Sequence, residues 1–273
     1  MPADGAEHGS STGDGTVGKA LDVLDLVAQS GRPVRFSELL EHRLFPKATL
    51  YRFLQTLTNQ GMLSYDSTTG NYALGVRLVR LAHAAWAQSS LAPIARPFID
   101  TLAAATGETV HLAQMDQAQV LYVDKRNATR PVEMYSQAGK VGPAYCTGVG
   151  KAMLAFMAEP ALDAALQRQS FHAFTPQTLA TPTALRTELS AIRARGYAFD
   201  REEHEQGIIC VAVPILSRSG QIMGAMSVTS TTQRTTLDAL EQQVGRIKDC
   251  AAAISAAAES WRFPEQNQKG GML

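Results

Sequence analysis

The stretch FPKATLYRFLQTLTNQGMLSYDSTTGNYALG, residues 45–75, decides the fold of the N-terminal part of the chain. Pro46 suits the first position of a helix, the following residues have a helical pattern, and Gly61 suits the position just past the helix end. Two short runs, MLSYD and NYALG, then flank the polar turn STTG and predict a hairpin. The stretch therefore predicts a helix followed directly by two polar-tipped strands.

Two shorter helical patterns precede this stretch. Apolar residues recur at helical spacing from Val17 to Val27, and the segment SGRP ends that helix. The segment RFSELLEHRLF predicts a second, short helix with Ser37 as its N-cap. Three helices and a hairpin within residues 17–75 match the plan of a winged helix-turn-helix. Residues 1–16 are rich in Gly, Ser, Thr and Asp and predict a disordered arm.

The third predicted helix has one apolar and one polar face. Leu50, Phe53, Leu54 and Leu57 fall on one side, where we expect them to pack against the first helix. The polar side carries the donors that read bases, because Gln pairs with adenine and Arg pairs with guanine or phosphate. A merely solvated helix and turn remain the alternative. The predicted DNA-binding residues are Lys47, Ala48, Thr49, Tyr51, Arg52 and Gln55 on the helix, with Thr68 and Thr69 at the hairpin tip.

Composition sets broad limits on the class of protein. The 273 residues are 45% hydrophobic and 18% charged, and 25 Lys and Arg balance 25 Asp and Glu. A zero net charge excludes a wholesale polyanion binder but permits a small DNA-reading module beside a neutral domain. We find no apolar run long enough for a bilayer and no signal-peptide core, and Cys146, Cys210 and Cys250 are too scattered for a disulfide framework. A cytoplasmic protein without membrane partners is expected.

The rest of the chain predicts an α+β domain built on an antiparallel sheet. Residues 76–91 predict a linker helix, residues 92–262 the domain, and residues 263–273 a flexible tail. The predicted strands are TVHLAQM, QVLYVDKR, PVEMYS, GYAFD, GIICVAVPIL and IMGAMSVTS. The predicted helices are PFIDTLAAATG, GVGKAMLAFM, PTALRTELSAIRARG and a long final helix from about Arg234 to Trp261.

Several phrases resemble one family of bacterial transcription factors. GKALDVLDLVAQSG, FPKATLYRFLQTLTNQGML and YALGVRLVRLAH resemble the DNA-binding domain of the IclR (isocitrate lyase regulator) family. GPAYCTGVGKAMLAF and FDREEHEQGIICVAVPI resemble its effector-binding domain, and the resemblance runs from Val17 to about Ser260. One departure is LLEHRLF, which lacks the glycine usual between helices two and three. The resemblance implies a GAF/profilin-like sensor domain, and homodimers or homotetramers.

The resemblance also implies an effector site in the second domain. Its glycine-rich turn would present backbone amides at a helix N-terminus, which favours an anionic or carbonyl group. Ser227 and Thr229 lie two apart on a predicted strand and so share one face. The implied ligand is a small organic acid, with aromatic or hydroxylated acids as the options. The implied effector-binding residues are Gly148, Val149, Asp200, Cys210, Ser227 and Thr229.

These observations predict a ligand-responsive repressor that binds double-stranded operator DNA and controls catabolic genes. No catalytic residues, metal or cofactor are expected, and TGVGK is not a phosphate loop because Tyr145 and Ala152 break that motif. Besides a scaffold that uses the winged helix for protein contacts instead of DNA, two alternatives from other classes remain open. One is an enzyme that modifies a small acid with Cys210 as nucleophile. The other is a metal-responsive regulator that draws ligands from Cys146, Cys210, Asp200, His111 and His204.

Overall fold

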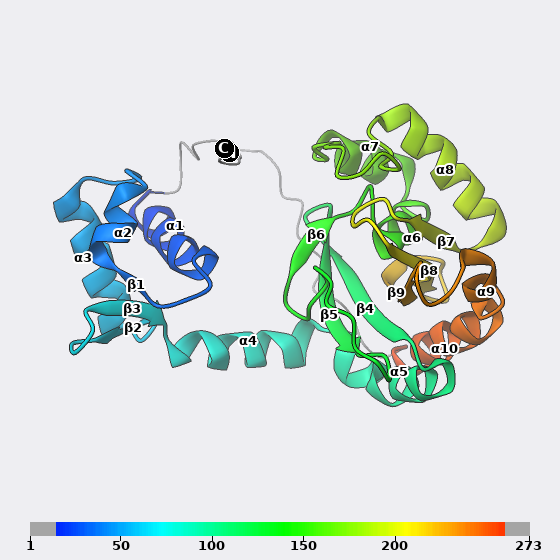
Figure 1. Cartoon of the computed structure of the whole chain (residues 1–273), viewed down its shortest axis with the longest axis horizontal. Helices are drawn as coiled ribbons and strands as arrows, with labels where there is room; N and C mark the ends of the chain where they lie inside the picture. The colour runs from blue at the N-terminus through cyan, green and yellow to red at the C-terminus, as the bar shows by residue number, and fades with distance from the viewer. Residues whose placement is uncertain (1–14, 260–273) are drawn as a thin grey trace. The chain divides into compact units, whose positions relative to one another are not determined.

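The computed structural model describes residues 15–259, with the backbone alone for residues 86–89, and the chain forms two compact units, Met1–Trp86 and Ala87–Leu273 (Figure 1). Residues 1–14 of the predicted arm and the predicted tail lie outside the described residues. Each unit has its own hydrophobic core, so each is described by itself.

The first unit is a winged helix-turn-helix. Its three helices come before a hairpin, and within the described residues its sheet has three antiparallel strands in the order β1-β3-β2. Leu50, Phe53, Leu54 and Leu57 are buried together with Val23 and Val27 of the first helix, as their spacing predicts. The elements are α1 (Gly15–Gln29), β1 (Val34–Arg35), α2 (Phe36–Glu41), α3 (Lys47–Asn59), β2 (Leu63–Asp66) and β3 (Asn71–Leu74).

The helix ends of this unit differ from the prediction in small ways. The first helix begins at Gly15, inside the predicted arm, rather than at Val17. The N-cap of α2 is Arg35 rather than Ser37, because the Glu38 carboxylate accepts the Arg35 backbone N–H at 2.9 Å. Pro46 is the N-cap of α3 rather than its first helical residue.

The turn between α2 and α3 closes without a glycine. Arg43 takes a left-handed backbone conformation there, with φ of 53°. Its N–H donates to the carbonyl of Leu40 at 3.1 Å, which ends α2. A side chain in this conformation costs roughly 1–2 kcal/mol relative to the right-handed one, so the packing of α2 and α3 must supply that energy. The missing glycine therefore changes the cost of the turn and not its geometry.

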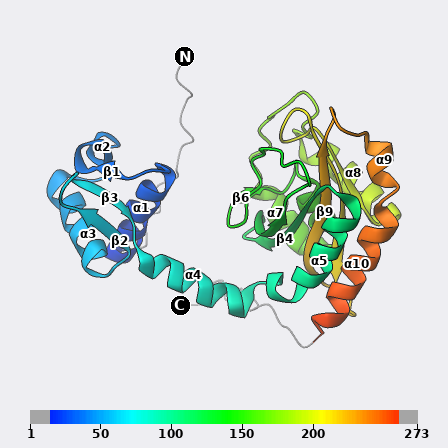
Figure 2. The same ribbon diagram turned by 60° about the horizontal axis from the view of Figure 1, so that its bottom comes forward.

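The second unit is an antiparallel sheet covered by helices on both faces. Within the described residues the sheet has six strands in the order β6-β5-β4-β9-β8-β7. The helices α5 and α10 lie side by side in both views, and α6 packs against β8 and β9 (Figures 1 and 2). The strands are β4 (Thr109–Asp116), β5 (Gln119–Arg126), β6 (Val141–Pro143), β7 (Ala198–Arg201), β8 (Ile208–Leu216) and β9 (Ile222–Thr231). The helices are α4 (Val76–Ser89), which crosses the boundary between the units, α5 (Ala92–Thr106), α6 (Gly148–Leu154), α7 (Glu159–Gln167), α8 (Pro182–Arg195), α9 (Leu237–Glu241) and α10 (Val244–Ala257).

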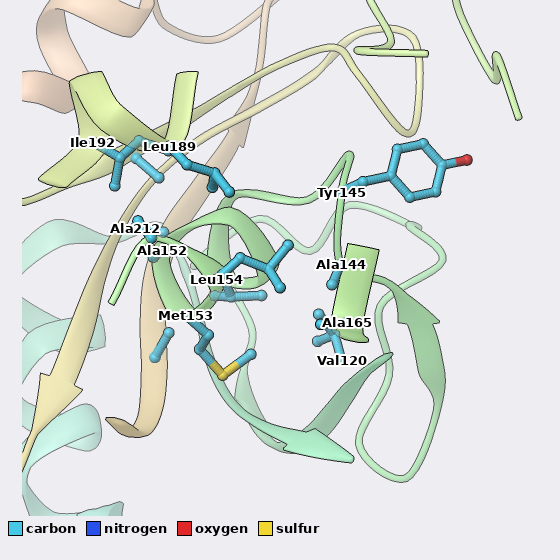
Figure 3. Close-up of a cluster of buried hydrophobic side chains, with 14 of the residues drawn as sticks. Val120, Ala144, Tyr145, Ala152, Met153, Leu154, Ala165, Leu189, Ile192 and Ala212 are labelled. Carbon is cyan, nitrogen blue, oxygen red and sulfur yellow. The ribbon is translucent and has the colours of Figure 1, made fainter. Parts of the chain in front are cut away.

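The core on the α6 side of the sheet holds that short helix in place. All seven residues of α6 are buried, and its apolar side chains pack with Leu189 and Ile192 of α8 and Ala212 of β8 (Figure 3). Tyr145, just before α6, points away from the labelled cluster, and its hydroxyl donates to the carbonyl of His172 at 2.7 Å. The start of α6 is therefore fixed against the sheet by packing.

Two predictions for this unit are wrong, and one helix has no counterpart in them. Residues 131–136 form no strand, because β6 and residues 139–140 pair with β5 at the edge where such a strand would lie. The final helix is split into α9 and α10, and it cannot begin at Arg234 because the Thr236 side chain caps α9 by accepting the Ala239 N–H at 3.2 Å. The helix α7 was not predicted.

No helix within residues 15–259 combines the length and the apolar composition needed to cross a bilayer.

Candidate functional site

The predicted DNA-binding residues lie on α3 and at the tip of the β2–β3 hairpin of the first unit. All of the six on α3 are exposed except Thr49, which is partly buried. The side chains of Lys47, Arg52 and Gln55 make no hydrogen bond or ion pair with any described residue, so their donors are free. Tyr51 is half exposed and contacts the ring of Phe36 edge-on at 6.2 Å. Free donors on an exposed helix face are what base and phosphate contacts require.

The hairpin tip is ordered by one acidic residue. Asp66 accepts the Thr68 backbone N–H at 2.8 Å and the Thr69 hydroxyl at 2.7 Å. The Thr69 hydrogen bond, followed by that of the Thr68 amide, lowers the pKa of Asp66, which therefore remains ionised in the turn. The Thr69 hydroxyl proton is thus already used inside the turn.

In the second unit, strand register brings four predicted effector-binding residues onto one face of the sheet. Asp200 of β7 lies opposite Cys210 of β8, and Cys210 lies opposite Thr229 of β9. Two residues before Thr229 on β9, Ser227 lies opposite His111 of β4. Side chains two apart on a strand share a face. The row Asp200–Cys210–Thr229 and the pair Ser227–His111 therefore lie side by side and form the polar floor of the site. All five of these residues are buried.

A small, partly open cavity of about 30 Å³ lies over this floor. The start of α6 covers one side through Thr147, Gly148 and Val149, so all six predicted effector-binding residues line the cavity. Its volume holds only about two water molecules. The remaining lining residues, which the sequence did not predict as effector-binding, are His111, Tyr122, Ser136, His204, Glu205 and Ile208.

Two irregular segments close the mouth of the cavity. The Tyr135 backbone N–H donates to the Glu205 carboxylate at 2.9 Å, and the Tyr135 ring meets His204 edge-on at 5.0 Å. His204 in turn contacts Phe174 at 4.8 Å. These contacts join residues 131–140 to residues 202–207 by one hydrogen bond and ring packing. These contacts can break without disrupting the hydrogen bonds of the sheet, so the two segments can separate at the mouth of the cavity.

His111 links the floor to the segment that covers it. Its Nδ1 lies 3.2 Å from the Thr229 hydroxyl and its Nε2 lies 2.8 Å from the Ser136 hydroxyl. Burial, with a smaller effect from the charge of Lys125, lowers the pKa of His111 to about 3. The imidazole is therefore neutral at physiological pH, with one nitrogen donating and the other accepting.

Two buried carboxyl groups, those of Asp200 and Glu203, lie close to one buried lysine, Lys151. Lys151 of α6 is fully buried and its Nζ forms an ion pair with the Glu203 carboxylate. Asp200 accepts the Glu203 backbone N–H at 2.8 Å. Burial, and then the charge of Glu203, raise the pKa of Asp200 to about 7. Asp200 is thus divided between its acid and carboxylate forms at neutral pH and can serve as donor or acceptor.

Gly148 and Cys210 fit each other closely at the cavity wall. A Cβ on residue 148 would lie 2.4 Å from the Cys210 sulfur, so any side chain there would force Cys210 to move. Burial, and then the charge of Asp200, raise the pKa of the Cys210 thiol well above its usual value. Cys210 is therefore a protonated packing group, and its thiolate is strongly disfavoured. Within residues 15–259, no three His, Cys, Asp or Glu side chains form a group that could hold a metal ion.

Comparisons with known proteins agree along nearly the whole chain. Residues 16–67 match the model described as the IclR helix-turn-helix domain. Residues 83–256 match the one described as Bacterial transcriptional regulator IclR C-terminal. The HTH-type transcriptional regulator XynR of Escherichia coli K12 is 31% identical over 242 residues, which cover 89% of this chain and 96% of that protein. Transcriptional repressor IclR of the same organism is 30% identical over 243 residues, which cover 88% and 86%.

A solved structure has the same architecture. The crystal structure of the Thermotoga maritima IclR matches with a TM-score of 0.73 and 30% identity, over 89% of this chain and 98% of that one. A winged helix-turn-helix joined to a sensor domain defines a ligand-responsive, DNA-binding transcription regulator. The chain belongs to the IclR family of bacterial transcriptional regulators.

Proposed function

We propose that this regulator represses catabolic genes and that a small organic acid, bound in the polar cavity of the second unit, changes its affinity for operator DNA. The observation that carries the proposal is the convergence of α6, β7, β8 and β9 on one buried polar cavity. Buried polar groups around a cavity are the usual means of orienting a small ligand. The repressor role is suggested by similarity to the transcriptional repressor IclR.

Effector entry requires movement of the segments over the cavity. Organic ligands occupy sites of roughly 300 Å³ or more, whereas the cavity in this structure has a volume of about 30 Å³. The contacts of Tyr135 with Glu205 and His204 must therefore break or shift when the effector enters. A ligand that binds one arrangement of these segments more tightly than the other shifts the population between them, which is the energetic basis for a response at the DNA.

The reading surface uses α3 and the hairpin tip. We propose that Arg52 and Gln55 contact base edges, with Tyr51, Thr49 and Ala48 beside them. In this arrangement Lys47 and Thr68 contact the phosphate backbone, and Thr69 shapes the tip through Asp66. An operator-binding protein acts where the chromosome is, so we propose a cytoplasmic location for this chain.

We propose assembly into homodimers or homotetramers. In the first unit, apolar side chains of α1 and α4 are exposed: Val17, Leu21, Val76 and Val79. Large exposed apolar side chains gathered on a few elements are typical of surfaces that another molecule covers. A dimer would also add a second reading helix, which suits a chain with no net positive charge.

An enzymatic role for Cys210 is disfavoured by its surroundings. A nucleophilic cysteine needs a lowered pKa and an adjacent base, whereas burial and Asp200 raise the pKa of Cys210. The imidazole of His111 is engaged by Ser136 and Thr229. We therefore propose that the cavity binds its ligand without converting it.

The DNA-binding part of the proposal is tested with the full-length chain and labelled DNA from upstream of its own gene. We expect specific binding that Arg52→Ala weakens by about 10- to 100-fold, because one base contact contributes roughly 1–3 kcal/mol. The matched control is Arg168→Ala, which removes an exposed arginine from the second unit. Equal affinities for the wild type and Arg52→Ala would contradict the reading surface.

A further inference from the structure

The cavity lining holds two carboxyl groups and, among the described residues, no cationic side chain. Asp200 and Glu205 both contribute carboxyl groups to the lining, and no Lys or Arg among the described residues does. Two lysines are close enough to act on lining residues but lie outside the lining. Lys151 is paired with Glu203, and Lys125 of β5 lies outside the lining, although its charge acts on His111 and Glu205.

The two histidines of the lining add no positive charge. Burial lowers the pKa of His111 to about 3 and also lowers the pKa of His204. Both imidazoles are therefore neutral at physiological pH. A ligand with two carboxylates would meet the buried Asp200 and the partly buried Glu205 and no Lys or Arg in the lining, which is a costly arrangement.

The lining is also rich in hydroxyl groups that keep unused hydrogen-bonding capacity. The Tyr122 hydroxyl makes no hydrogen bond within the described residues, and burial holds its pKa far above 10, so it remains a donor. Ser227 and Thr229 bond to each other at 3.1 Å and to His111, and each oxygen can still accept a further bond. Ser136 and Thr147 each have one intramolecular partner and the same spare capacity.

The lining therefore offers both hydrogen-bond acceptors and donors. Asp200 and Glu205 accept hydrogen bonds, Tyr122 donates, and the Ser and Thr hydroxyls do both. We infer that the effector is a polyhydroxylated small molecule carrying no more than one negative charge, as sugar acids and alditols do, whose hydroxyl groups donate to Asp200 and Glu205 and accept from Tyr122. This inference rests on the proposed function of the cavity as the effector site.

Other classes of organic acid leave these groups without partners. A hydroxyl-free acid such as benzoate or hexanoate offers no donor to the two carboxyl groups that line the cavity. Burying such a ligand would desolvate Asp200 and Glu205 without replacing their hydrogen bonds with water. Hydroxyl groups on adjacent carbons supply several donors within a small volume, which matches carboxyl groups on two different walls.

The test measures binding to the full-length chain by calorimetry and by thermal unfolding. The probes are D-gluconate, D-glucitol, D-glucarate, hexanoate and benzoate, together with the four- and five-carbon relatives of the first three. We expect binding by at least one hydroxylated probe with no more than one charge, at least tenfold weaker binding by its dicarboxylate relative, and none by hexanoate or benzoate. Binding by hexanoate or benzoate at equal or higher affinity, or by no hydroxylated probe, overturns the inference.

Two substitutions separate recognition from structural effects. Tyr122→Phe should weaken binding of the tightest hydroxylated probe by about tenfold. The control is Tyr197→Phe, which should leave this affinity unchanged because the Tyr197 hydroxyl donates to Glu241, away from the cavity. Glu205→Gln keeps an acceptor for the Tyr135 N–H but removes a carboxylate. The affinity for the dicarboxylate probe should therefore rise by about tenfold relative to the affinity for the monocarboxylate probe. An equal change for both probes in Glu205→Gln would contradict the role of charge.

The ligand class and the proposed function fail in different ways. Operator affinity is measured with each probe that binds. Hydroxylated probes that bind without changing operator affinity contradict the proposed function and support the ligand class. Hydroxyl-free acids that bind and change operator affinity contradict the ligand class and support the proposed function.

Discussion

The reading surface and the effector cavity are built in opposite ways. The proposed DNA contacts come from two neighbouring segments, residues 47–55 and 68–69, and their key side chains are exposed and unpaired. The cavity takes its residues from five strands, the start of α6 and two irregular segments, and its floor residues are buried. A surface that meets DNA needs only a stable helix beneath it. A cavity needs register, packing and charge balance across the whole unit, so substitutions there should affect stability as well as binding.

The ion pairs of the two units show the same contrast. In the first unit Arg32 and Glu38 form a pair whose side chains are 63% and 37% exposed. In the second unit Lys151 and Glu203 are 0% and 3% exposed. Water can replace a lost partner at the first pair and cannot at the second.

The largest expected effect is therefore that of Lys151→Ala. It leaves the Glu203 carboxylate buried without its cation, which should lower the free energy of unfolding of the second unit by about 3–5 kcal/mol. Urea unfolding followed by circular dichroism measures the change. The matched control is Arg32→Ala, which should unfold at the same urea concentration as the wild type. Similar losses in both variants would break the contrast between the units.

A smaller effect is expected from pH at Asp200. Its pKa is about 7 in the folded chain and near the ordinary 3.8 when unfolded, so the folded state holds the proton more tightly. The stabilisation from protonated Asp200 is full below 3.8 and is lost as the pH rises through 7. Asp200→Asn, which mimics the neutral form, should gain about 2 kcal/mol relative to the wild type between pH 5 and pH 8. Thermal unfolding across that range measures this difference, and a constant one would contradict the buried-acid account.

The sequence predicted the first unit well because its structure follows from local rules. The apolar positions of α3, Gly61 after its end and the STTG turn each determine a feature within a few residues of themselves. Gly61 has a φ of 69°, and the next N–H bonds back to Leu57 at 2.9 Å, the closing pattern that a glycine at this position predicts.

The cavity could be predicted only in part. The positions carried over from the family resemblance lie together in the structure, but His111, Tyr122 and Glu205 join them through register and loop packing that one sequence does not encode locally. His111 and His204 were considered only as metal ligands. Residues 131–136 have the alternation of a strand, yet β6 occupies that edge of the sheet. The helix α7 did have a local signal, because Leu162, Ala165 and Leu166 follow Pro160 at helical spacing.

The division of labour between the two units is tested most directly by one set of operator titrations. The wild type, Arg52→Ala and Ser227→Ala are titrated with operator DNA, without ligand and with the small molecule that most raises the melting temperature of the full chain. Arg52→Ala should lose about 1–2 kcal/mol of DNA binding under both conditions and keep its response to the ligand. Ser227→Ala should bind DNA as the wild type does without ligand and should lose most of the response. A full response in Ser227→Ala, or equal losses of ligand-free affinity in both variants, would contradict the account.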